Sequence, residues 1–146
     1  MCMALYLATD EPVPMSEWSR ASALFVDELN SEQYRVKRQF AKPTVRYIGV
    51  LGKWMCSCAF PSVLETSTDA EGCQLIEELR SLFLSGTANG REVELFYCWM
   101  DDEGDEPERR VETTPESLGS ESCPLETGTF YRVRGAAQQG VAADEP

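Results

Sequence analysis

Residues 69–100, DAEGCQLIEELRSLFLSGTANGREVELFYCWM, decide the fold class because they join the clearest helix pattern of the chain to its clearest strand pattern. Thr68 and Glu71 have the spacing of a capping box, which satisfies the free amides of a first helical turn. Apolar side chains then recur along one helix face, at Leu75, Ile76, Leu79, Leu82 and Phe83. Residues 92–100 become apolar on both faces in their second half, as in a central strand. We therefore predict a helix over 69–85 and a central strand over 92–100.

The flanking sequence predicts further strands. Compact apolar or β-branched segments occur at 3–8, 24–29, 44–50 and 129–134. Residues 32–40 fit a short helix or a strand equally well, and the acidic stretch 101–128 is expected to be a long loop with one helical turn near 115–118. The fold class predicted is α+β: a mainly antiparallel sheet of about five strands with one principal amphipathic helix packed on one face. Helix 69–85 would then make a right-handed crossover between strands 44–50 and 92–100.

The length of 146 residues corresponds to a single domain, which we place at 1–135. The polar segment 136–146 is expected to be a disordered tail. No segment approaches the roughly 18 apolar residues of a membrane helix, and the N-terminus lacks the basic start of a secretory signal. We therefore expect no membrane association, a cytoplasmic location and reduced cysteines.

The formal net charge of −12 is unevenly distributed. Residues 101–146 hold 12 acids and 4 bases, whereas residues 31–55 hold 6 bases and 1 acid. A chain this acidic repels phosphate backbones, so we expect no nucleic-acid binding and favour a basic protein surface as the partner. The basic stretch is expected to be a solvated face that offsets the acidic remainder.

The chain contains no histidine. This excludes the Ser-His-Asp triad, the Cys-His dyad and every metal site that uses an imidazole. The sequence also lacks the glycine-rich phosphate-binding motifs. We therefore favour a small, non-catalytic binding or interaction protein without a cofactor, whose ligand the sequence does not specify.

The alternative is a thiol site. Cys56 and Cys58 flank a single residue, which brings two sulfurs together for redox chemistry or for zinc or another soft metal, with Cys2 as a third ligand. Cys98 or Cys123 would be the fourth ligand, but the chain has no second close pair at zinc spacing, and a purely structural role stays open.

Three other features carry expectations of their own. Trp54, beside Lys53, lies in a loop where a large ring has no evident burial, which favours a partner contact. Cys2 would be an N-terminal nucleophile if Met1 were removed, with the terminal amine as its base. The acidic run 101–108 does not match an EF-hand and is expected to be a hydrated loop, with a weak divalent-ion site as the alternative.

Three stretches carry a resemblance to a known family: the start MCMALYLATD, Lys42-Pro43-x-Val45-x-Tyr47-x-Gly49, and Cys56-x-Cys58-x-Phe60. Together they resemble a family of small uncharacterised bacterial proteins with a glycine-flanked cysteine loop. The resemblance covers about the first 60 residues, and Met55, Ser57 and Ala59 stand where that pattern has glycine. It implies a bacterial cytosolic protein and draws attention to Cys2, Cys56 and Cys58, and it implies no activity.

Overall fold

The computed structural model describes residues 2–10, 24–50, 70–118 and 123–135. Their helices and strands follow one another in the order β1 (Met3–Thr9), β2 (Leu24–Asp27), η1 (Tyr34–Gln39), β3 (Thr44–Val50), α2 (Ala70–Gly86), η2 (Ala88–Gly90), β4 (Glu92–Trp99), β5 (Arg109–Thr113) and β6 (Thr129–Arg134). The predicted strands at 3–8, 24–29, 44–50, 92–100 and 129–134 are present, as is the predicted helix, which extends through Gly86. The expected tail at 136–146 lies outside the described residues.

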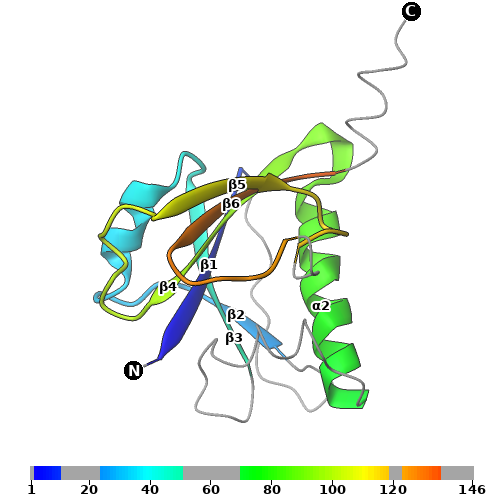
Figure 1. Cartoon of the computed structure of the whole chain (residues 1–146), viewed down its shortest axis with the longest axis horizontal. Coiled ribbons are helices and arrows are strands. Elements are labelled where there is room, and N and C mark those ends of the chain that lie inside the picture. Colours follow the sequence, from blue (N-terminus) through cyan, green and yellow to red (C-terminus); the bar gives the residue numbers. More distant parts are fainter. Residues whose placement is uncertain (1, 11–23, 51–69, 119–122, 136–146) are drawn as a thin grey trace, which may run out of the picture.

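The strands form one sheet in the order β2-β3-β1-β4-β6-β5 (Figure 1). Every neighbouring pair is antiparallel except β5 and β6, which are parallel. The fold class is therefore α+β, but the sheet is mixed and has six strands, which corrects the expected five-stranded antiparallel sheet. The missed strand, β5, lies within the segment expected to be a loop. An outermost strand needs few apolar residues, so the Arg-Arg-Val-Glu-Thr sequence of β5 gave little signal.

α2 connects two parallel strands. β3 and β4 each pair antiparallel with β1, so they run parallel to each other with β1 between them. This is the arrangement of a crossover helix, as the sequence predicted. The α2 side of the sheet, which we call the helix face, carries the larger core, made of Leu5, Leu7, Val26, Ile48, Leu79, Phe83, Val93, Leu95, Tyr97, Leu118, Cys123, Leu125, Tyr131 and Val133.

η1, cyan in Figure 1, lies on the opposite side of the sheet, which we call the η1 face. This face holds a second and smaller core. Its members are Ala4, Tyr6, Ala8, Val36, Val45, Tyr47, Phe96, Cys98 and Phe130. The sheet is thus covered on both faces at its centre, because strand alternation sends β1, β4 and β6 side chains into both cores. α2 is the one principal helix, and η1, a short 3₁₀ helix, adds cover to the second face.

A reciprocal cap closes the turn that leads into η1. The Asn30 side-chain oxygen accepts from the Gln33 amide at 2.9 Å, and the Gln33 side-chain oxygen accepts from the Asn30 amide at 2.9 Å. This is the logic of a capping box, with Asn and Gln in place of the usual Ser and Glu. Of the two structures that the sequence allowed for residues 32–40, the chain adopts the short helix. No helix in the described part of the chain is both long and apolar enough to cross a membrane.

Candidate functional site

Glu103 is the buried member of the acidic run that follows β4. Its side chain is 4 % exposed, whereas its acidic neighbours Asp102 and Asp105 are exposed. The Tyr6 hydroxyl donates to Glu103 Oε2 at 3.0 Å, and the Asp101 amide donates to Oε1 at 2.9 Å. Arg35 of η1 adds a hydrogen bond from Nη2 to Oε1 at 3.3 Å. A carboxylate is tolerated in this position because donors surround it.

Burial also raises the pKa values of two groups near Glu103, the Tyr6 phenol and the Cys98 thiol. Desolvation raises the pKa of the Tyr6 phenol above its ordinary value, and the negative charge of Glu103 raises it further. The pKa of the Cys98 thiol is raised by the same two causes in the same order. Both groups therefore keep their protons at neutral pH. A thiol held protonated is a poor nucleophile and a poor metal ligand, so Cys98 acts as a core side chain.

The backbone of the acidic loop is held in place from η1. The Gln39 side-chain amide donates to the carbonyl of Glu103 at 2.9 Å and to that of Asp105 at 2.7 Å. Turn hydrogen bonds join the Asp102 amide to the Trp99 carbonyl and the Asp105 amide to the Asp102 carbonyl, each at 3.0 Å. The loop is thus a fixed structure, although its exposed carboxylates suggested only a hydrated segment.

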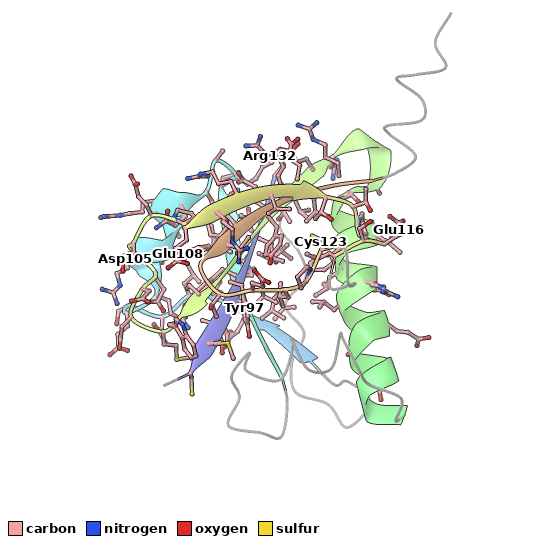
Figure 2. The ribbon with its side chains drawn as sticks, in the orientation of Figure 1. Tyr97, Asp105, Glu108, Glu116, Cys123 and Arg132 are labelled. Carbon is pink, nitrogen blue, oxygen red and sulfur yellow. The ribbon has the colours of Figure 1, made fainter. Side chains whose placement is uncertain are left out.

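This loop, β4 and the turn before β6 line a small open hollow of about 100 Å³. Four exposed carboxylates line it, with no basic residue among the lining residues: Asp102, Asp105, Glu106 and Glu108. The strand side is formed by Phe96, Cys98, Trp99, Thr127 and Gly128. Figure 2 shows Asp105 and Glu108 at one end of the molecule, far from Glu116 beside α2. The arrangement can accept a cationic group through charge-assisted hydrogen bonds.

Gly128 closes the hollow. Its backbone has φ of +79°, and a Cβ there would lie 2.9 Å from Glu108 Oε2. The Gly128 amide donates to the Tyr97 carbonyl at 2.8 Å, and its own carbonyl accepts from the Glu108 amide at 2.7 Å. Glycine is favoured here by the left-handed backbone, and a Cβ would also displace the Glu108 carboxylate.

A second buried carboxylate, Glu94 of β4, holds the far end of η1. It is 2 % exposed, and its Oε1 accepts from the amides of Ala41 and Lys42 at 2.9 and 2.8 Å. Glu94 and Glu103 therefore fasten the same segment to the same sheet face from two positions. The groups that they hold are backbone amides and η1 side chains, so Glu94 has a structural role.

The described residues do not test the thiol hypothesis, because its central pair, Cys56 and Cys58, lies outside them. Cys98 lies in the core of the η1 face and Cys123 in the core of the helix face, so the sheet separates them and they cannot complete one site together. Cys2 is partly buried, and its carbonyl accepts from the Met100 amide. Within the described ranges, no three Cys, Asp or Glu side chains are arranged to hold a metal ion. Residues Lys53, Trp54, Cys56 and Cys58 lie outside those ranges.

The basic stretch is engaged within the molecule more than expected. Arg35 contacts Glu103, and Lys42 Nζ lies 3.0 Å from Asp10 Oδ2. Lys37 lies over the Tyr34 ring, 4.5 Å from its centroid. The basic residues thus serve partly to hold η1 and the strand that follows it.

Sequence reasoning missed Glu103 and Glu94 as anchors. Nothing local distinguishes Glu103 from the other acids of its run, because its phenol partner is 97 residues away along the chain. Glu94 offered a weak signal, a charged residue inside a strand whose neighbours are apolar. A charge at such a position is buried only when it has partners.

Comparison of the chain with protein-family models, with curated proteins and with solved structures finds no match.

Proposed function

We propose that this protein is a non-catalytic binding protein whose acidic hollow receives a lysine or arginine side chain from a basic protein surface. The observation that carries the proposal is the lining of the hollow: Asp102, Asp105, Glu106 and Glu108 surround about 100 Å³ without a basic neighbour among them. Carboxylates that line one hollow offer several acceptors to a single cationic side chain, through charge-assisted hydrogen bonds.

The fixed backbone of the acidic loop supports the same proposal. Glu103 and the Gln39 amide fix the backbone of the loop before any partner arrives, so binding does not have to order it. The net charge of −12 would steer basic partners toward the molecule at long range. Because the carboxylates are exposed, each contact is worth only about 0.2–1 kcal/mol and weakens with salt. A partner must therefore present an extended basic surface, of which the hollow takes one side chain.

The test is an NMR titration of the full chain with penta-arginine and penta-lysine peptides at low ionic strength. We expect the amide shifts to concentrate at residues 99–108 and 127–128. The variant Asp105→Asn/Glu106→Gln should weaken binding by about twofold to thirtyfold, since it removes two exposed charge contacts.

The matched control is Glu77→Gln/Glu116→Gln, which changes the net charge equally at two exposed acids on α2 and in the loop beyond β5. It should change the affinity by less than about twofold, because these acids are far from the hollow. Equal losses in the two double variants would show that only the net charge matters, and the proposal would then fail.

The cysteine-based alternative, with Cys56 and Cys58 binding zinc or acting as a redox pair, stays a separate prediction of the sequence. Native mass spectrometry of protein purified without chelator or reductant would test it. A bound metal, or a mass two units lower, that disappears in Cys56→Ser would favour this alternative over a plain binding protein.

A further inference from the structure

β5 is the outermost strand of the sheet, and β6 is its one strand neighbour in the described part of the chain. An outermost strand presents unpaired backbone donors and acceptors, which makes it a template for pairing with another strand. The exposure of Arg109, Arg110 and Glu112 is consistent with an accessible edge. What this edge pairs with is independent of the acidic hollow.

Side-chain contacts fix which face each β5 residue occupies. The Arg110 guanidinium lies over the Phe130 ring of the η1 face, 5.0 Å from its centroid. Glu112 lies on the same side, within 3.8 Å of Arg132 and 3.7 Å of Arg134. Val111 alternates to the other side and packs against the core of the helix face. Arg110 and Glu112 are thus opposite charges on one face, with Val111 midway between them.

We propose that β5 is a self-association edge, which pairs antiparallel with β5 of a second copy about a two-fold axis at Val111. In that register Val111 faces Val111 of the second copy, and each Arg110 faces a Glu112. Residues directly opposite one another in an antiparallel pair share a sheet face, so both charge pairs form on the η1 face. The result is one continuous sheet across two copies, with an isologous interface.

Charge complementarity favours pairing with a second copy over the alternative, in which the charged residues only prevent pairing at this edge. Charged residues on outer strands often prevent pairing, and a single sign of charge does so best, since like charges then meet. Here Arg110 and Glu112 have opposite charges and lie one residue on either side of Val111, so self-pairing in this register forms two attractive Arg110–Glu112 contacts. The described strand has only five residues, and its interface is smaller than the roughly 1,200 Å² of a stable complex. We therefore expect a weak dimer that forms at concentrations on the order of 100 µM.

Disulfide trapping of the full chain tests the register. Val111→Cys places two thiols opposite each other across the axis, whereas Arg110→Cys places its thiol opposite Glu112. Under mild oxidation at about 150 mM salt, we expect Val111→Cys to give a covalent dimer linked through position 111, identified by mass spectrometry of the linked peptide. Arg110→Cys and the unchanged chain should give at least fivefold less dimer. Equal yields from the two cysteine variants would indicate random collision and overturn the register.

Sedimentation equilibrium tests the association itself without new thiols. Arg110→Glu creates two Glu–Glu contacts across the axis and should reduce dimerisation at least tenfold. Arg110→Glu/Glu112→Arg exchanges the charges, restores both attractive pairs and should recover at least half of the lost association. An unchanged chain that is monomeric at about 1 mM would overturn the proposal, as would an Arg110→Glu variant that associates as well as the unchanged chain.

Discussion

The two faces of the sheet are held by different interactions. The helix face is covered by α2 through an apolar core in which Leu79 and Phe83 are buried. The η1 face has the smaller apolar core and adds two buried carboxylates, Glu94 and Glu103, which bind the segment that crosses it. Apolar packing tolerates exchanges of similar volume, whereas a buried carboxylate depends on each of its donors. The faces should therefore respond differently to substitution.

The largest effect is expected on the helix face. Phe83→Ala removes a side chain that is 1 % exposed and leaves a cavity beneath α2, which should lower the free energy of unfolding by about 3–5 kcal/mol. Leu84→Ala on the same helix removes a side chain that is 52 % exposed and should cost less than about 0.5 kcal/mol. Urea denaturation of both variants measures the contrast. A cost below about 1 kcal/mol for Phe83→Ala would mean that α2 contributes little to the core.

The helix face was also the part that the sequence predicted. The stripe from Leu75 to Phe83 is local, because a helix repeats its buried face every three or four residues. Central strand β4 could be predicted equally well, since the second half of its sequence is apolar on both faces and most of its side chains are buried. Contacts of this kind depend on hydrophobicity and spacing alone, both of which are visible in a single chain.

The next largest effect is expected on the η1 face. Glu103→Gln replaces the carboxylate by a neutral amide, whose oxygen can still accept from the Asp101 amide. The Tyr6 hydroxyl then loses its acceptor and Arg35 loses its ion pair, so the free energy of unfolding should fall by about 1–3 kcal/mol. Glu106→Gln is the control, since this exposed acid belongs to the same run. Similar denaturation midpoints for the two variants would show that Glu103 does not anchor the loop.

The site on this face was harder to predict because its contacts are long-range and polar. The acidic run was recognised, but the contrast between buried Glu103 and exposed Asp105 depends on where Tyr6 and η1 come to lie. No local pattern encodes that position. The Asn30–Gln33 cap was the one signal that could have identified η1 beforehand. Strand β5 was missed for a related reason. Its sequence carries little hydrophobic signal, and its place in the sheet depends on its pairing with β6, which no local pattern encodes.

Alkaline solution should expose a further difference between the faces. Burial and Glu103 raise the pKa of the Cys98 thiol, whereas an unfolded chain loses this proton near pH 8.5. Above that pH the folded state binds more protons than the unfolded state, so stability falls as pH rises. The slope contributed by Cys98 approaches about 1.4 kcal/mol per pH unit, or about 2 kcal/mol between pH 8.5 and 10.

Denaturation under reducing conditions from pH 7 to 10 measures this slope. In Cys98→Ala, the free energy of unfolding should fall less between pH 8.5 and 10 than in the unchanged chain. At pH 7 the variant should be less stable than the unchanged chain. A decline that is unchanged in Cys98→Ala would assign it to other groups. Above pH 10 the phenols of Tyr6 and Tyr131, whose pKa values burial also raises, add a loss from each face of the sheet.

The smallest stability effect lies at the hollow itself, where two glycines near the acidic loop make opposite predictions. Gly128→Ala forces a side chain onto a backbone with φ of +79° and brings its Cβ to 2.9 Å from Glu108 Oε2, which should cost about 1 kcal/mol. Gly104→Ala places its Cβ 3.5 Å from the Arg35 side chain, an ordinary contact, and should change stability by less than about 0.5 kcal/mol. Because Glu108 must move only in Gly128→Ala, only that variant should also weaken penta-arginine binding. Loss of binding in both variants would mean that the loop backbone, rather than the position of the Glu108 carboxylate, limits the hollow.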